Sequence, residues 1–279
     1  MQINKDGIYC NAEQHLTRAH GGPIAPRFIV MHYTAGWGAE SALSTFCRAE
    51  ARVSAQFVIG RDGKVYQCVP CTEAAWHAGP SVYRGVRGLN QHSVGIEFVN
   101  IGYLTPAGEG VVVDPYGTKR KVTELPSEHR GDTTFVHASH PRLGGGIKFW
   151  PTYTEAQLDA ADVLVSALTQ RYKIEDIVSH EQVDTRGWKT DPGPAFPMDR
   201  YRLLLGTGEV DQHPRYLVRA NPRLNVRGGP GTGFEVLRSL DSGAAVWLLE
   251  REGDWCLVRL SGNEDIDEGW VHGNYLVPA

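Results

Sequence analysis

The chain has 279 residues, of which 41% are hydrophobic and 22% are charged, and its formal net charge is −4 at pH 7. This length and hydrophobic content suit one large core and a second, smaller domain. A slightly acidic chain without a basic run argues against nucleic acid as a partner. The chain has no apolar run of about eighteen residues and does not start with basic residues followed by an apolar stretch, so we expect neither membrane insertion nor an ordinary signal peptide. Composition leaves the oligomeric state open.

Strand and helix patterns alternate from residue 28 to residue 180 and favour an α/β architecture, a mixed central sheet flanked by helices. FIVMHY is an apolar run that places His32 at the end of a buried strand. SVGIEFV is a second apolar strand, interrupted only by Glu97. The expected elements are, in order, a strand at 28–33, a helix at 41–52, a hairpin of strands at 55–59 and 65–69, and a strand at 93–99.

The middle of the chain has a different composition. Residues 102–150 are rich in Gly, Pro, Thr and charged residues and show weak periodicity, so we expect an inserted loop region over one end of the sheet. Thr154 is a plausible N-cap with Gln157 at the capping-box position, which predicts a helix with one apolar face. A strand-like segment at 174–178 then leads into His180.

The last part of the chain predicts a small all-β barrel. Residues 206–213 form a polar, Gly-bearing stretch that precedes Pro214 and is typical of a linker. The predicted domains are therefore 1–205, which contains the 102–150 insertion, and 214–279. In the second domain the expected strands are 224–227, 235–240, 245–249, 255–260 and 269–272, separated by Gly-rich turns.

The segment SHEQVDTRGWKTDPGPAF, residues 179–196, suggests a metal site. Pro192 disfavours helical backbone at Asp191, and a second proline two residues later stiffens the turn further. A rigidly held carboxylate is suited to bind a metal. His180 and Asp191 can supply two of the three protein ligands that a catalytic zinc site normally has, with the fourth position left for water.

Further candidates lie at the same predicted edge of the sheet. His32 can meet His180 and Asp191 there as the third ligand, and Glu97 can face the attacking water. The alternative for Glu97 is a buried carboxylate paired with an arginine, although an uncompensated charge in an apolar strand is costly and more often has a partner in a site. Lys189, two residues before Asp191, would lie beside the metal.

Five segments together resemble the zinc-dependent type 2 class of N-acetylmuramoyl-L-alanine amidases. This class includes muropeptide-recycling amidases, bacteriophage endolysins and, more distantly, peptidoglycan recognition proteins. The resemblance covers roughly residues 20–205, and its motifs occur in the right order. The segments are FIVMHYTAG (28–36), VSAQFVIGRDGKVYQCVP (53–70), AWHAG (75–79), NQHSVGIEFVN (90–100) and HEQVDTRGWKTDPGPAF (180–196).

The resemblance implies a zinc cofactor and a role for each of five residues. His32, His180 and Asp191 would be the zinc ligands, Glu97 the acid and base that handles the water, and Lys189 the group that stabilises the oxyanion. The bond implied is the amide between the lactyl group of muramic acid and L-alanine. The ligand would be peptidoglycan or its muropeptides.

Other positions that match the family are Trp76, His77 and Asn90, which the resemblance places along the substrate cleft. An ordinary core histidine satisfied by backbone is the alternative for His77. Gln56 stands where the family commonly has histidine. This difference puts in doubt one contact that a neighbouring side chain would make to the zinc ligands, but it leaves the ligands themselves in place. The inserted histidines are expected at the surface, because no carboxylate or cysteine pattern supports a second metal site there; they are His129, His137 and His140.

Residues 214–279 resemble the bacterial SH3-like domain. The resemblance rests on LNVR-x-GP, W-x-x-V and GWV-x-x-x-YL. Such domains are often attached to wall hydrolases and bind peptidoglycan. The tryptophans and Tyr275 are expected in the core or the rim of the barrel.

The resemblance leaves the biological setting open. An endolysin, made in the cytoplasm and released through a holin pore, is favoured over an antibacterial toxin delivered by a specialised secretion route. A cytoplasmic enzyme that recycles anhydro-muropeptides is third, because such enzymes have little use for a wall anchor. The alternative of another class is a peptidoglycan receptor without catalysis, but such receptors typically lack one or more of the zinc ligands.

Overall fold

The computed structural model describes residues 2–48, 50–126, 134–205, 215–260 and 268–278. The chain divides into two compact units, Met1–Thr207 and Gly208–Ala279. The predicted linker at 206–213 lies outside the described residues. Within the described part of the chain, no helix has the length and apolar character required to cross a membrane.

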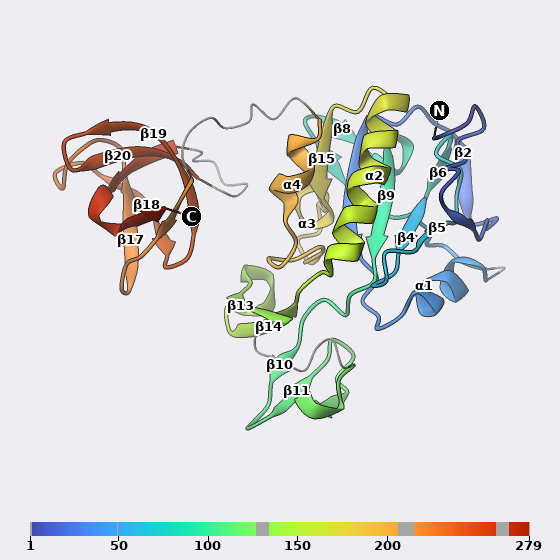
Figure 1. Ribbon diagram of the computed structural model, residues 1–279, viewed down its shortest axis with the longest axis horizontal. Coiled ribbons are helices and arrows are strands. Elements are labelled where there is room, and N and C mark those ends of the chain that lie inside the picture. Colours follow the sequence, from blue (N-terminus) through green and yellow to red (C-terminus); the bar gives the residue numbers. More distant parts are fainter. Residues whose placement is uncertain (1, 49, 127–133, 206–214, 261–267, 279) are drawn as a thin grey trace. The chain divides into compact units, whose positions relative to one another are not determined.

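The first unit is built on a six-stranded sheet in the order β1-β5-β4-β9-β3-β15 (Figure 1). Its neighbours β4, β9, β3 and β15 are parallel, whereas β5 is antiparallel to β4, so the sheet is mixed as predicted. A parallel sheet segment of this kind has to be covered on both faces. The strands are β1 (Glu13–Gln14), β3 (Phe28–Tyr33), β4 (Phe57–Ile59), β5 (Val65–Gln67), β9 (Ser93–Phe98) and β15 (Asp176–Ser179).

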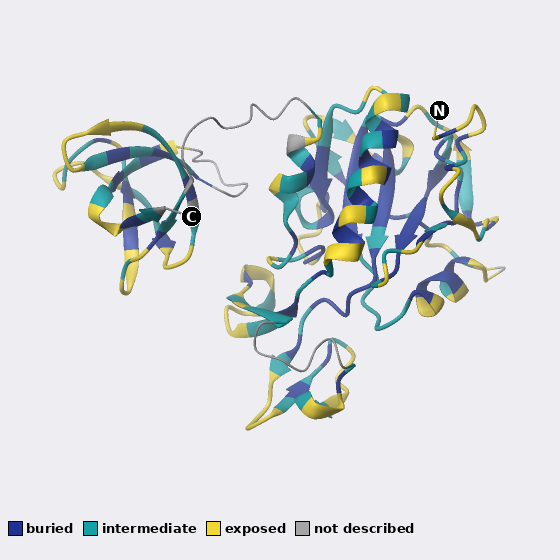
Figure 2. Ribbon diagram, in the orientation of Figure 1, coloured by how far each residue is buried: buried dark blue, intermediate teal, exposed yellow. Residues whose placement is uncertain are grey.

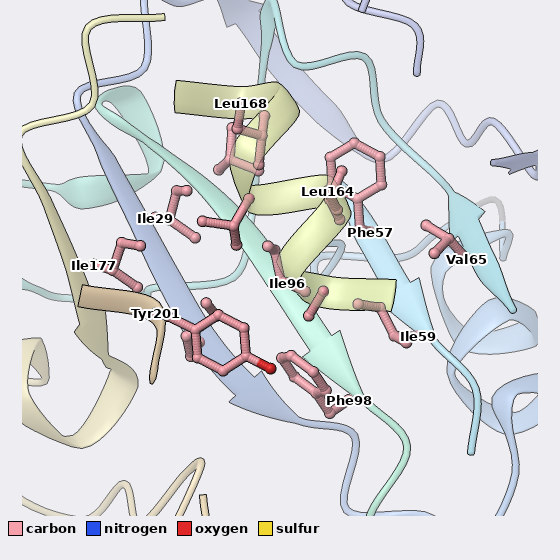
Figure 3. Close-up of a cluster of buried hydrophobic side chains, with 14 of the residues drawn as sticks. Ile29, Phe57, Ile59, Val65, Ile96, Phe98, Leu164, Leu168, Ile177 and Tyr201 are labelled. Atoms are coloured by element: carbon pink, nitrogen blue, oxygen red, sulfur yellow. The ribbon is translucent and has the colours of Figure 1, made fainter. Parts of the chain in front are cut away.

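Helix α2 (Glu155–Arg171) covers one face of this sheet (Figure 1). The predicted capping box is present, because Thr154 Oγ1 accepts a hydrogen bond from Gln157 N and Gln157 Oε1 accepts one from Thr154 N. Figure 2 shows the strands beneath α2 buried and the outward side of the helix exposed. Burying one large apolar side chain here contributes about 1.5–3 kcal/mol. Figure 3 shows the core between them, which includes Ile29, Phe57, Ile96, Phe98, Leu164, Leu168 and Ile177.

The opposite face of the sheet carries the side chain of His32. Along β3, Ile29 and Met31 belong to the core under α2, whereas Phe28 and Val30 belong to a separate cluster on the other face. Successive strand residues alternate between faces, so His32 lies on the same face as Phe28 and Val30. Therefore His32 lies on the face that α2 leaves free.

The remaining helices are short. Helix α1 (Ala39–Phe46) is shorter than the predicted 41–52 and has Cys47 as its C-cap. Residues 48–52 bring no large apolar side chain that could hold another turn on the core. Helices α3 (His180–Val183) and α4 (Met198–Leu203) follow β15. Two small ladders complete this region: β2 (His20–Pro23) with β6 (Glu73–Ala75), and β7 (Val82–Tyr83) with β8 (Val86–Arg87).

Residues 102–150, predicted as a loop region, contain two small antiparallel sheets in their described part. One has three strands and the other is the hairpin of β13 (Phe135–Ser139) and β14 (Ile147–Pro151). Their apolar residues form a cluster of their own around Leu104 and Val112. The strands have two to five residues each, too few for a clear periodic pattern. The three-stranded sheet contains β10 (Thr105–Pro106), β11 (Val111–Val113) and β12 (Lys119–Lys121).

The second unit is an antiparallel sheet of seven strands in the order β18-β17-β21-β20-β19-β16-β22, which confirms the predicted all-β class. Valines dominate its buried cluster. Trp247, Trp255 and Trp270 are partly buried and Tyr275 is exposed. The strands are β16 (Arg215–Val218), β17 (Arg223–Arg227), β18 (Val236–Asp241), β19 (Ala245–Glu252), β20 (Trp255–Leu260), β21 (Glu268–His272) and β22 (Leu276–Pro278).

Candidate metal centre and active site

Three side chains converge on one point at the edge of the central sheet. His32 Nδ1 lies 3.0 Å from His180 Nδ1, and Asp191 Oδ2 lies 2.9 Å from each of these nitrogens. The three residues are 1%, 2% and 6% exposed, respectively. In the part of the chain that the structure describes, they are the one group of His, Cys, Asp or Glu residues that could hold a metal ion.

The parallel strands explain why these side chains meet. His32 is near the end of β3, and His180 follows β15, which pairs with β3 in parallel. The carboxyl ends of parallel strands lie at one edge, which is where open α/β sheets bind ligands. Asp191 reaches the same edge in a loop that includes a cis Asp191-Pro192 bond, and Tyr153 Oη donates a hydrogen bond to Pro192 O at 2.7 Å.

The ring of His180 has a fixed orientation. Its Nε2 lies 3.3 Å from Ala78 O, and a carbonyl can only accept, so Nε2 carries the proton. The lone pair of His180 is therefore on Nδ1, the nitrogen that faces His32 and Asp191. A backbone carbonyl that orients a ligand histidine in this way is common around metal sites.

The ring of His32 is held by a longer chain of contacts. His32 Nε2 lies 3.0 Å from His77 Nδ1, His77 Nε2 lies 3.3 Å from Ser93 Oγ, and Ser93 Oγ donates to Leu89 O at 2.6 Å. With Nδ1 of His32 unprotonated for a metal, the protons in this chain all point away from the centre. His77 also packs on the β9 backbone, since a methyl group at Gly95 would lie 2.6 Å from His77 Cγ.

Burial favours the protonation states that metal binding requires. Burial, followed by the charge of His180, lowers the pKa of His32 to about 4. Burial would raise the pKa of Asp191, but hydrogen bonds with His180 and His32 outweigh it and hold the pKa of this carboxyl below its ordinary value. At neutral pH a neutral His32 and an ionised Asp191 are ready to bind a cation.

The residues fit zinc. Two imidazole nitrogens and one carboxylate oxygen are a common catalytic zinc donor set, with bonds of about 2.0–2.2 Å. Tetrahedral bonds of that length need donors about 3.3 Å apart, a little wider than the 2.9–3.0 Å found here. Small side-chain rotations supply the difference, so His32, His180 and Asp191 would hold the ion.

Glu97 is close to this triad, because it lies on the strand next to His32. It pairs in register with His32 on the adjacent parallel strand, and therefore lies on the same face. Its Oε2 is buried without a hydrogen-bond partner among the described residues. Burial, followed by the charge of Asp191, raises the pKa of Glu97 well above its ordinary value, and Lys189 opposes this shift. No arginine pairs with Glu97 there, so the environment suits a proton-transferring group.

Lys189 is half-buried in the loop between α3 and Asp191. Its positive charge lowers the pKa of both His32 and Glu97, so Lys189 is close enough to influence both residues. Asp184, whose side chain is fully buried, accepts hydrogen bonds from Trp188 N and Lys189 N at 3.1 and 3.3 Å. These bonds hold the backbone from which Lys189 extends.

The predicted cleft residues have varied surroundings. Asn90 Oδ1 accepts hydrogen bonds from His77 N and Ala78 N at 3.1 and 2.7 Å, so it holds the loop that carries the Ala78 carbonyl. His77 is 7% exposed, and its ring nitrogens lie within hydrogen-bond distance of the His32 ring and of the Ser93 hydroxyl group. Trp76 is partly buried, and its backbone N–H donates to Ser54 Oγ at 3.0 Å. Substrate contact by these residues stays a prediction.

Gln56 occupies the position where the family commonly has histidine. Its Oε1 accepts a hydrogen bond from Gly95 N at 2.7 Å, and its Nε2 donates to Glu73 O at 3.0 Å. Gln56 therefore links β9 to β6 near Glu97, and it makes no hydrogen bond to the predicted metal ligands.

The histidines of the insertion were predicted at the surface, and for His140 this is wrong. His140 is 8% exposed, and its Nε2 lies 2.7 Å from Glu181 Oε2, next to the ligand His180. This pair could not be predicted from the sequence, because its members are 41 residues apart and the insertion shows only weak periodicity. His137 is exposed, as predicted, and stacks on Phe149. His129 lies outside the described residues.

Comparisons with known proteins agree with this geometry. A family model described as N-acetylmuramoyl-L-alanine amidase matches residues 21–194, and one described as bacterial SH3 domain matches residues 222–277. The N-acetylmuramoyl-L-alanine amidase AmiD of Escherichia coli (strain K12) is 29% identical over 206 residues, which are 70% of this chain and 58% of AmiD. The 1,6-anhydro-N-acetylmuramyl-L-alanine amidase AmpD of Enterobacter cloacae is 30% identical over 161 residues, 57% of this chain and 60% of AmpD.

A solved structure supports the fold. The crystal structure of a selenomethionine derivative of AmpD superposes with a TM-score of 0.51 at 23% identity, and the match covers 74% of this chain and 99% of that one. The chain spans about three fifths of the length of the curated relatives that it matches. Because the first family model covers more than half of the 279 residues, the chain belongs to the N-acetylmuramoyl-L-alanine amidase family and carries a bacterial SH3 domain after the amidase domain.

Proposed function

We propose that this chain is a zinc-dependent hydrolase that cleaves the amide bond between N-acetylmuramic acid and L-alanine in peptidoglycan. The observation that carries the proposal is the convergence of three ligand atoms within 3.0 Å of one another, on the same face of the sheet as the buried, unpartnered oxygen of Glu97. Membership of the amidase family supports the same bond.

Each residue has a defined task in this reaction. When bound, zinc would polarise the scissile carbonyl and lower the pKa of a water from 15.7 to about 7. Glu97 takes a proton from the attacking water and delivers it to the leaving amine of L-alanine, a task suited to a carboxyl whose pKa is raised. Lys189 places a positive charge near the developing oxyanion.

Replacing Glu97 tests this mechanism. Glu97→Ala should keep zinc, because Glu97 is not a ligand, but should release peptide from purified sacculi about 10²–10⁴-fold more slowly. Metal content by mass spectrometry and peptide release by amine labelling are the two measurements. Glu109→Ala, at an exposed glutamate of the insertion, is the matched control and should leave both values unchanged. Full activity of Glu97→Ala would overturn the assignment.

We further propose that the enzyme acts on wall polymer in an endolysin-like role, with residues 214–279 as a wall-binding domain. The SH3 family match supports this setting, because an enzyme that acts on soluble wall fragments needs no domain that binds it to the wall. The curated relative AmpD is named for a 1,6-anhydro substrate, which makes recycling the main alternative, and a secreted toxin would use the same wall substrate. Mass analysis of products from intact sacculi and from soluble anhydro-muropeptide tests the preference. Faster cleavage of the soluble substrate would favour recycling.

A peptidoglycan receptor without catalysis is the alternative of another class. All three ligand positions are occupied by residues that can bind zinc, which argues against it. A chain that binds sacculi, carries no zinc after purification without chelators and releases no peptide would support the receptor instead.

A further inference from the structure

The hairpin β13–β14 of the insertion contacts the loop that carries most of the proposed active site. This segment, which we call the ligand loop, runs from His180 to Phe196 and begins with the short helix α3. It includes two of the three proposed ligands as well as Lys189. Figure 1 shows the hairpin near the edge of the sheet at which β9 ends. Its Phe135 and Phe149 pack on the apolar cluster of the insertion. The hairpin is therefore held in the insertion by this packing, and its contacts to the loop come in addition.

The first contact is a partly buried pair next to the proposed ligand His180. His140 Nδ1 accepts a hydrogen bond from Arg142 N at 3.2 Å, so the proton of the ring is on Nε2, which lies 2.7 Å from Glu181 Oε2. Glu181 N in turn donates to Asp191 O at 3.0 Å. Glu181, immediately after His180, is thus joined to the hairpin through its side chain and to Asp191 through its backbone.

The second contact lies just beyond the other ligand of the loop. Trp150 in β14 is 1% exposed, and its Nε1 donates to Ala138 O across the hairpin at 3.1 Å. A methyl group at Gly193 would lie 2.7 Å from Trp150 Cε3, so the indole ring packs directly on the backbone of the Pro-Gly-Pro turn. This turn directly follows Asp191.

The third contact is at the predicted oxyanion residue itself. Arg142, in the turn of the hairpin, donates from Nη1 to Lys189 O at 2.6 Å. This bond is exposed, whereas the pair of His140 and Glu181 is partly buried. It nevertheless fixes the backbone at the residue whose side chain has to meet the developing charge.

We propose that the β13–β14 hairpin is a brace for the ligand loop, and that His140 and Arg142 are positioning residues for the proposed zinc site and Lys189. The three contacts are at residues 181, 189 and 193. The first is next to His180, and the other two lie on either side of Asp191. Groups that orient metal ligands from outside typically change metal affinity or activity 10–100-fold when they are removed. The consequence for zinc and catalysis rests on the proposed function, whereas the restraint on the loop does not.

Hydrogen–deuterium exchange of the full chain tests the restraint directly. His140→Ala combined with Arg142→Ala should speed deuterium uptake in peptides that cover residues 181–191, and should leave uptake in α2 unchanged. The matched control is His137→Ala combined with Lys148→Ala, which removes a histidine and a cation from the same hairpin without touching the loop. His140→Gln should restore slow uptake, because its amide can still donate to Glu181.

The same variants test the consequence for the site. In a chelator competition, His140→Ala with Arg142→Ala should bind zinc about tenfold more weakly. With saturating zinc, kcat should fall while KM stays close to that of the wild type, because Lys189 acts in the transition state. His140→Gln should recover zinc affinity.

The outcomes separate the two proposals. Unchanged uptake in the double variant, or equal uptake in the control, would overturn the brace. Faster loop exchange with unchanged zinc affinity and kcat would overturn the positioning role. A wild-type chain that binds no zinc and cleaves no amide would overturn the proposed function, while faster exchange in the variant would still support the brace as a restraint.

Discussion

His77 connects His32, a proposed zinc ligand, to Ser93 of β9 and through it to Leu89 in the turn before β9. The chain of contacts runs from the His32 ring through His77 and Ser93 to the backbone carbonyl of Leu89. A second histidine that orients the ring of a metal ligand increases metal affinity, although it does not contact the metal itself.

Removing His77 should therefore weaken zinc binding in a folded protein. We expect His77→Ala to lower zinc affinity about 10–100-fold. The measurement is a competition titration with a chromophoric chelator, and the absorption spectrum of the cobalt-substituted protein should change as the His32 ring loses its fixed position. His137→Ala, at an exposed histidine, is the control. Unchanged affinity with an unchanged cobalt spectrum would make His77 an ordinary core residue.

The sequence predicts residues of the site when their side chains carry the chemistry. The proposed ligands, together with Glu97 and Lys189, are visible because a histidine or a charge in an apolar strand, or before Pro-Gly-Pro, is unusual. The carbonyl of Ala78 is invisible in a sequence, because every residue has one. Ser93 is equally hidden, since its role depends on His77, 16 residues away.

At the scale of elements, predictability follows length and pattern. Strands β3 and β9 and the start of helix α2 were predicted nearly to the residue, because each buries a regular face in a large core. The insertion was not, because each of its short strands buries at most two residues and depends on contacts to Leu104 and the ligand loop. The predicted helix at 41–52 extends too far at its C-terminal end, where nothing apolar holds it.

The role of α2 in the core leads to a stability prediction. Leu168 is fully buried in the cluster between α2 and the sheet, whereas Val163 on the same helix is 47% exposed. Leu168→Ala should lower the free energy of unfolding by about 2–5 kcal/mol, and Val163→Ala should change it by less than about 0.5 kcal/mol. Urea unfolding followed by circular dichroism measures both. Equal losses for the two variants would contradict this assignment of the core.

At the scale of the whole molecule, the chain consists of two units with separate cores. All three proposed zinc ligands belong to the first unit. A ligand that binds only the folded state stabilises it by about 2.7 kcal/mol when its concentration is 100 times the dissociation constant.

Chelation should therefore affect one unit and not the other. With EDTA, the calorimetric transition of the first unit should move to lower temperature, and the transition of the C-terminal unit should stay in place. Restoring zinc should reverse the shift. A shift of the C-terminal transition, or no shift at all, would contradict a zinc site confined to the first unit.

The separation of the ligands along the chain has a consequence for the order of events during synthesis. His180 and Asp191 are 11 residues apart, but His32 precedes His180 by 148 residues. A nascent chain therefore offers zinc at most the local pair until β15 has emerged and paired with β3. Because that pairing closes a long loop, it is slow relative to local helix formation. Zinc uptake at the proposed site would follow sheet assembly, and an incompletely folded chain would remain without the ion.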